Sequence, residues 1–209
     1  MISYKIHLLR SGAASDGPEK KYFGRMDIPL CEGGRERLRQ MAEEFYYPPV
    51  QRVYTSPLSR CVQTAEILYP GHQLQEVPGL EDMSLGIFEG KSFDELKGDA
   101  AFVRWLDNSL ENAPPGGEKA LDFTQRVLGA FDAVVRQMMR DKITDAAVIT
   151  HGGVIMALMA ATALPRLPIH EWAADNGCGY TLLTSTQMWL RDGAAEAFAV
   201  LPGKLTDEE

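Results

Sequence analysis

Short runs of apolar residues alternate along this chain with longer amphipathic segments. The short runs predict strands at residues 4–9, 52–55, 73–77, 146–150 and 180–185, and a final pair around 188–190 and 197–201. Strands that alternate with helices are typical of a sheet covered by helices on both faces. We therefore expect an α/β fold, namely a three-layer α/β/α sandwich with a mostly parallel central sheet.

The longer segments carry apolar residues at helical spacing. They predict helices over residues 33–45, 57–68 and 118–140, of which the first is amphipathic with a charged face toward solvent. Ser56 and Pro57 are the residue types of an N-cap and a first helical turn, and Leu121 is one of the apolar positions of the third helix. The weakly polar stretch 152–164 is too short to cross a bilayer and predicts a buried helix.

Residues 92–117 interrupt this alternation. They contain two short helical stretches and end in a run rich in proline and glycine. A chain of 209 residues can bury a sufficient core as one domain. We expect a single domain over residues 1–209, in which residues 92–117 form an inserted lid or specificity segment.

Composition narrows the classes of partner. The formal net charge of -8 argues against nucleic acid or an anionic membrane surface, because both need a broad basic face on the protein. Cys31, Cys61 and Cys178 are an odd, widely spaced set, which predicts free thiols in a reducing cytoplasm rather than disulfides or a zinc site. The amino-terminal residues lack the pattern of a secretory signal. We expect a cytoplasmic protein without a membrane span, a metal or a cofactor.

Polar side chains follow three of the predicted strands. Arg10 and Ser11 follow the first strand, Arg60 comes shortly after the second, and His151 comes directly after the strand that ends at residue 150. Ligands bind at the carboxyl ends of strands in an open α/β sheet, where helix N-termini also offer N–H groups to anions. Singly, such residues are most often surface ion pairs or structural histidines. Together they predict an anion site, because each charge-assisted contact to phosphate contributes about 1.5–3 kcal/mol.

The remaining histidines have no partners in the sequence that indicate metal binding. We interpret them as structural or solvated: His7, His72 and His170.

Several longer motifs occur in one order over nearly the whole chain. They are the segments 10–12, 23–30, 55–65, 85–90, 116–118 and 149–153, of which Thr-Ser-Pro-Leu-Ser-Arg-Cys-Val-Gln-Thr-Ala at 55–65 is the most specific. On these motifs the chain is identified as a member of the histidine phosphatase superfamily, also called phosphoglycerate mutase-like. Segments 22–25, 88–91, 105–107 and 115–118 most resemble α-ribazole phosphatases within it.

The resemblance implies a role for each candidate residue. Arg10, Arg60 and His151 would hold a phosphoryl group, and His151 would also assist charge development on its oxygens. The family carries Arg-His-Gly where this chain has Arg10-Ser11-Gly12, so Ser11 occupies the position of the phosphate-accepting histidine. Asp82 falls at the position of the acid that protonates the leaving oxygen, with Glu81 beside it. Glu81 and Asp82 also fit a solvated acidic turn. The sequence does not decide which of the two would be the acid.

The serine predicts impaired chemistry. A serine hydroxyl needs a nearby base, whereas a histidine nitrogen attacks directly and leaves through a labile P–N bond, and enzymes stripped of a nucleophile lose on the order of 10⁶ in turnover. The family's usual Thr and Asn in the first loop are replaced by Ala14 and Gly17, which together with Asp82 favours natural divergence over a single engineered substitution at Ser11.

Two hypotheses about function follow. In the first, the chain is a phosphomonoesterase-family protein that binds a small phosphorylated metabolite and hydrolyses it weakly or not at all. In the second, it is a non-catalytic phospholigand-binding pseudophosphatase or regulatory protein. Neither requires a cofactor, and the sequence leaves assembly into a homodimer open.

Overall fold

Seven strands form the central sheet of the computed structural model, which describes residues 2–16 and 21–204. The strand order is β4-β3-β5-β1-β7-β8-β6. Neighbours from β4 to β1 are parallel, β7 is antiparallel to β1 and β8 to β7, and β6 is parallel to β8. The strands are β1 (Ser3–Arg10), β3 (Arg52–Thr55), β4 (Leu74–Glu76), β5 (Asp145–Thr150), β6 (Ala163–Leu164), β7 (Gly179–Ser185) and β8 (Ala195–Leu201). A separate two-stranded ribbon pairs β2 (Phe45–Tyr46) with β9 (Gly203–Lys204).

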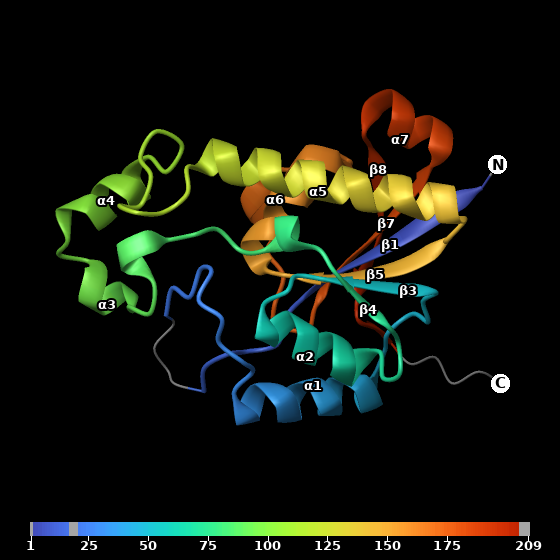
Figure 1. Ribbon diagram of the computed structural model, residues 1–209, viewed down its shortest axis with the longest axis horizontal. Coiled ribbons are helices and arrows are strands. Elements are labelled where there is room, and N and C mark those ends of the chain that lie inside the picture. Colours follow the sequence, from blue (N-terminus) through green and yellow to red (C-terminus); the bar gives the residue numbers. More distant parts are fainter. Residues whose placement is uncertain (1, 17–20, 205–209) are drawn as a thin grey trace.

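Helices cover both faces of this sheet (Figure 1). Helices α1 (Glu32–Glu44) and α2 (Ser59–Leu68) lie on one face, and α5 (Ala120–Asp141) and α6 (Gly152–Thr162) on the other. Side chains of β1 alternate between the two cores, because successive residues of a strand point to opposite faces: Leu8 packs in the core under α5 and α6, and Leu9 in the core under α1 and α2. The prediction of a three-layer sandwich with a mostly parallel sheet is confirmed.

The predicted strand at residues 188–190 is wrong, because these residues lie in helix α7 (Thr186–Asp192). The Ser185 hydroxyl accepts the Met188 N–H at 3.2 Å, which caps the first turn. Gly193 ends the helix with a positive φ of 58°, the conformation that glycine adopts most easily. Trp189 is buried, and its indole N–H donates to Asp132 on α5.

Two further predictions about helices are also wrong. Helix α2 begins at Ser59 rather than at Pro57, and its N-cap residue makes no side-chain cap. The Asp27 carboxylate, from a distant loop, accepts the Ser59 N–H at 2.6 Å instead. Leu121 is 63% exposed, so it is not part of the core.

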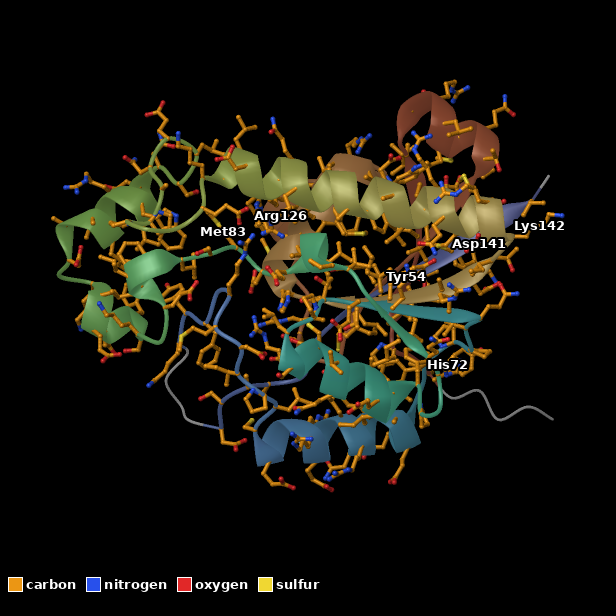
Figure 2. All side chains as sticks on the ribbon, in the orientation of Figure 1. Tyr54, His72, Met83, Arg126, Asp141 and Lys142 are labelled. Atoms are coloured by element: carbon orange, nitrogen blue, oxygen red, sulfur yellow. The ribbon has the colours of Figure 1, made fainter. Side chains whose placement is uncertain are left out.

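Residues 92–117 contain helices α3 (Phe93–Leu96) and α4 (Ala100–Asp107). Figure 1 shows both beyond the N-terminal end of α5, at a distance from the sheet. They build a small apolar cluster of their own, in which Leu96 and Phe102 pack with Leu85 and Phe88. Figure 2 shows Arg126 toward this end of α5 and Asp141 and Lys142 at the opposite end. The short 3-10 helices are Pro78–Leu80, Gly86–Phe88 and Ile169–Trp172.

Candidate phosphate site

The carboxyl ends of β1, β3 and β5 meet at one edge of the sheet. Arg10 of β1 is in register with Thr150, the last residue of β5. Ser11, directly after β1, donates its N–H to the Thr150 carbonyl at 2.8 Å, and Ser56, directly after β3, donates its N–H to the Ile149 carbonyl at 2.9 Å. The predicted convergence of the three polar clusters is therefore present in the fold.

A cavity of about 400 Å³ opens at this edge. Five of the six candidate residues line it, namely Arg10, Ser11, Arg60, Asp82 and His151. Glu81 does not line this cavity, because its carboxylate turns to Arg25, whose Nε lies 3.4 Å away. The other lining residues are Gly12, Ala13, Ala14, Ser15, Lys21, Phe23, Gly152, Asp175 and Asn176.

The two arginines retain N–H groups for a ligand. Arg60 is 5% exposed; it donates Nη1 to the Met26 carbonyl and Nη2 to the Gly24 carbonyl, both at 2.8 Å, and Nε to His151. Arg10 donates Nη1 to the Ala174 carbonyl at 2.6 Å and forms no ion pair with any carboxylate in the described ranges. Because a guanidinium has five N–H donors, both side chains can still bind an anion.

His151 is neutral in this environment. Its Nδ1 lies 3.3 Å from Arg60 Nε, which can only donate, so the ring proton is on Nε2. Nε2 donates to the Ser56 hydroxyl at 2.9 Å and lies 3.5 Å from the Cys61 sulfur. Burial, followed by the positive charges of Arg60 and Arg10, holds the pKa of His151 well below its usual range.

Asp82 lies beside both of these groups. Its Oδ2 is 3.9 Å from Arg60 Nη2 and 3.9 Å from His151 Nδ1, and its Oδ1 accepts the Met83 N–H at 2.9 Å. Burial raises the pKa of the Asp82 carboxyl, although the Met83 N–H and Arg60 oppose this shift. A carboxyl group with a raised pKa at a cavity wall is suited to donate a proton.

Ser11 is fixed by its main chain. Its carbonyl accepts from Asn176 Nδ2 at 2.7 Å, and its side chain lies beside the Cys61 thiol, as does that of Ser56. Within residues 2–16 and 21–204, the Ser11 hydroxyl has no hydrogen bond to an imidazole or a carboxylate. No adjacent base for Ser11 is therefore present among residues 2–16 and 21–204.

The Cys61 thiol is expected to be inert in the folded protein. Cys61 is fully buried, and burial raises its pKa from 9.0 to about 12, which lowers the thiolate fraction about 1000-fold. Alkylation by iodoacetamide, followed by peptide mass spectrometry, should modify Cys61 only after unfolding. Cys31 and Cys178, which are half-buried, serve as internal controls, and native modification of Cys61 as fast as theirs would contradict this prediction.

The sequence profile of the histidine phosphatase superfamily (branch 1) matches residues 6–191. The chain belongs to this superfamily.

Relatives within the histidine phosphatase superfamily include mutases and phosphatases. The 2,3-bisphosphoglycerate-dependent phosphoglycerate mutase 2 of Gloeobacter violaceus is 31% identical over 160 residues, which cover 73% of this chain and 72% of that protein. The adenosylcobalamin/alpha-ribazole phosphatase of Salmonella typhimurium is 23% identical over 205 residues, with 94% of both chains covered. The crystal structure of the alpha-ribazole phosphatase from Shigella flexneri superimposes with a TM-score of 0.78 at 21% identity, over 98% of this chain and 100% of that one. This last likeness shows the fold.

The described residues contain neither a candidate metal site nor a candidate membrane span. No group of three or more His, Cys, Asp or Glu side chains is placed to hold a metal ion. No helix in the described part of the chain has the length and apolar character that a membrane span requires.

Sequence reasoning missed several residues around this superfamily site. Ser56 is predicted as a helix cap, yet its hydroxyl contacts His151. Cys61 is predicted as a core position, and its sulfur also lies against the same imidazole. The cavity wall also contains Lys21, Asp175 and Asn176, which lie outside the motifs, and Phe23, which lies in a motif but was assigned no role.

Proposed function

We propose that this chain binds a small phosphorylated metabolite through Arg10, Arg60 and His151, and hydrolyses it weakly or not at all. The convergence of two guanidinium groups and one imidazole on a single cavity carries the proposal; to bind phosphate, His151 would have to turn its one N–H from the Ser56 hydroxyl to the ligand. The N-terminus of α6 adds to it, because Gly152 lines the same cavity and the first N–H groups of a helix favour anions. A Cβ at Gly152 would lie 3.3 Å from Arg10 Nε, so glycine leaves room for this arginine.

The proposed impairment follows from Ser11. In a histidine phosphatase of the usual pattern a histidine would accept the phosphoryl group at this position. The Ser11 hydroxyl lies beside a thiol whose pKa is raised, so none of the described groups next to it is suited to take its proton as it attacks. Asp82 is the acid that we favour for the leaving oxygen, since it lines the cavity while Glu81 is paired with Arg25.

A second candidate function is a phospholigand-binding pseudophosphatase that carries out no turnover. The same missing base favours it, together with Ala14, which presents a methyl group to the cavity. Gly17, the other departure in this loop, lies outside the described residues.

The subgroup and the assembly are also proposals. An α-ribazole phosphatase-like character is supported by the coverage of 94% of both chains, whereas the mutase relative has the higher identity of 31% over a shorter region. A cytoplasmic location and a homodimer remain predictions.

Removal of Arg10 is expected to weaken phosphate binding. Arg10→Met deletes N–H donors that have no carboxylate partner among the described residues, and the loss of one or two charge-assisted hydrogen bonds should lower the affinity about 10- to 100-fold. Isothermal titration with inorganic phosphate and with orthovanadate measures the effect. Arg136→Met is a matched control, because Asp132, on the exposed side of α5, is the one ion-pair partner of Arg136 among the described residues.

The same titrations test the function itself. If the unmodified chain binds neither phosphate nor vanadate, the proposed function is wrong. If it binds phosphate, an aryl phosphate assay separates the two candidates: slow hydrolysis that Arg10→Met abolishes indicates a disabled enzyme, and binding without any hydrolysis indicates a pseudophosphatase.

A further inference from the structure

The main chain of residues 24–26 orients one of the proposed phosphate ligands. The carbonyl groups of Gly24 and Met26 each accept a hydrogen bond from the Arg60 guanidinium at 2.8 Å. The next residue, Asp27, holds the start of α2 through the Ser59 N–H. The position of this short segment therefore decides where the Arg60 guanidinium points.

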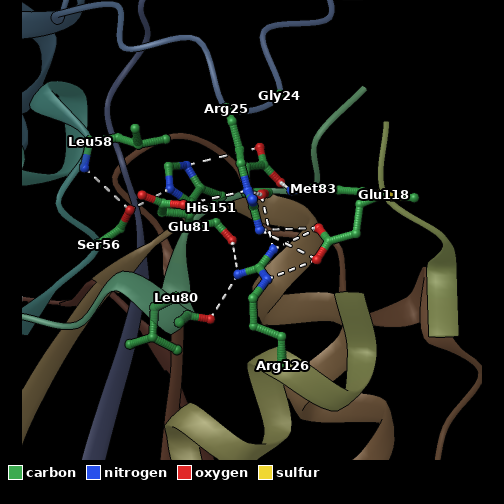
Figure 3. A network of polar contacts seen from close by, with 12 residues as sticks. Gly24, Arg25, Ser56, Leu58, Leu80, Glu81, Met83, Glu118, Arg126 and His151 are labelled. Carbon is green, nitrogen blue, oxygen red and sulfur yellow. Dashed lines mark hydrogen bonds and ion pairs between the residues drawn. The ribbon is translucent and has the colours of Figure 1, made fainter. Parts of the chain in front are cut away.

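The side chain between these two carbonyls reaches the opposite wall of the site. Arg25 Nε donates to the Asp82 carbonyl at 3.3 Å and lies 3.4 Å from a Glu81 carboxylate oxygen. Arg25 Nη2 lies 3.3 and 3.4 Å from the two carboxylate oxygens of Glu118. Figure 3 shows the Arg25 guanidinium beside the Arg126 guanidinium and the Glu118 carboxylate. One residue thus joins the segment that holds Arg60 to the loop that carries Asp82.

Arg126 completes this contact from α5. It uses Nε and Nη2 on the two Glu118 oxygens, at 2.9 and 2.8 Å, and donates to the carbonyls of Gly79, Glu81 and Asp82 at 2.9, 3.0 and 3.2 Å. These five hydrogen bonds occupy all five donors of the guanidinium. The carbonyl of Asp82 therefore accepts from two arginines, Arg25 and Arg126.

The clamped carbonyl determines the direction of the Asp82 side chain. The Asp82 carbonyl and the Met83 N–H belong to one planar peptide unit. The two arginines hold its oxygen, and its N–H donates to Asp82 Oδ1 at 2.9 Å. Rotation of this peptide would therefore move the carboxyl group that faces the cavity.

The backbone of Arg25 is itself fixed. Its N–H donates to Glu89 Oε1 at 3.1 Å, and the same oxygen accepts the Leu85 N–H at 2.8 Å. Gly24 turns the chain here with a positive φ of 52°, and a Cβ at this position would lie 2.5 Å from the Glu89 oxygen. The Arg25 side chain is thus aimed at the acid loop by contacts within the fold.

We propose that Arg25 is a positioning residue that holds the Asp82 carboxyl group and the Arg60 guanidinium in their mutual arrangement. This inference rests on the proposed function and adds to it a residue that touches no ligand. Arg25 acts through main-chain groups. Its side chain holds the Asp82 carbonyl, and its neighbours in sequence, Gly24 and Met26, supply the carbonyls that hold Arg60.

The choice of substrate separates a positioning role from a merely structural one. A general acid matters for a poor leaving group such as the alcohol of glycerol phosphate, and little for the nitrophenolate of p-nitrophenyl phosphate. In a Ser11→His background, Arg25→Met should lower kcat on glycerol phosphate about tenfold more than kcat on the aryl ester. Asp82→Asn should produce the same selectivity, Arg25→Lys should recover part of the loss, and Arg136→Met should change neither rate.

Phosphate affinity provides a readout that needs no turnover. In the unmodified chain Arg25→Met should weaken inorganic phosphate binding several-fold, because Arg60 loses its alignment. If Arg25→Met lowers kcat equally on both esters and also lowers the Tm, Arg25 is merely structural and the proposal is wrong. The proposal is also wrong if the rates and the phosphate affinity of Arg25→Met equal those of Arg136→Met. If the Ser11→His background is inactive, unchanged phosphate affinity alone overturns it. If the wild-type chain and Arg25→Met bind phosphate equally well, this inference is wrong and the proposed function stands. If the wild-type chain binds no phosphate, both are wrong.

Discussion

Ser11→His is expected to raise phosphomonoester hydrolysis by as much as about 10⁶-fold, the scale on which enzymes lose turnover when a nucleophile is removed. An imidazole nitrogen needs no base for attack on phosphorus, whereas the Ser11 hydroxyl has no base beside it in the described part of the chain. Because Ser11 is 4% exposed and lies against Cys61, the larger ring must turn into the cavity of about 400 Å³. That is the direction from which a bound phosphate would be attacked.

Steady-state hydrolysis of an aryl phosphate, together with trapping of an acid-labile phosphoenzyme, measures this gain. Ser11→Ala is the control and should leave the activity at the level of the unmodified chain, since the hydroxyl contributes no chemistry. Retained phosphate binding without a gain in turnover would contradict the prediction and favour the pseudophosphatase. A gain that appears only when Asp82→Glu is added would identify the shorter acid as a second cause of impairment.

Acid is expected to destabilise the folded chain through His7. This side chain of β1 is 1% exposed, its Nδ1 pairs with the Thr181 hydroxyl at 2.9 Å, and its Nε2 has no partner among the described residues. Burial lowers the pKa of His7 from 6.5 to about 4, with Lys5 in the same direction and Asp145 opposing. Between these two pH values the unfolded chain binds the proton and the folded chain does not, so the free energy of unfolding falls as the pH falls. The full effect is about 3 kcal/mol.

Urea unfolding of the unmodified chain and of His7→Gln at neutral pH and near pH 4 tests this expectation. The difference in unfolding free energy between the two proteins should shift in favour of the variant by about 3 kcal/mol on acidification. Other titrating groups, His151 and Asp82 among them, are common to both and cancel. His170→Gln is the control, because that side chain is 74% exposed, and an equal response of His7→Gln and the unmodified chain would refute the assignment to His7.

Periodicity and strand-end chemistry account for what the sequence could predict. Apolar residues recur along the long helices with helical spacing and fill the short buried strands, so both could be predicted. The polar clusters after β1, β3 and β5 converge because parallel strands end at one edge of the sheet. Helix α7 was missed although its signals are present: Ser185 is an N-cap and Gly193 a terminal glycine, but the short apolar run between them was interpreted as a strand. A run of this length does not distinguish the two structures.

The remaining features of the site depend on contacts between distant residues. Glu118 lies in a motif visible in the sequence, but nothing local indicates that Arg25 and Arg126 converge on it from opposite sides. Ser56 has the residue type of a helix cap, and its actual partner His151 lies 95 positions away. Contacts between residues that lie far apart in the chain leave no short-range pattern in the sequence, so they could not be predicted from it.

The carbonyl groups that orient Arg60 limit which substitutions between homologues can alter this site. Every residue type supplies a main-chain carbonyl, so replacement of Met26 leaves that acceptor in place. Gly24 is different, because its positive φ of 52° and the nearby Glu89 oxygen exclude most side chains. The orientation of Arg60 at the proposed phosphate site is thus set largely by the path of the backbone. Comparisons that score side-chain identity will understate how much of it two distant homologues share.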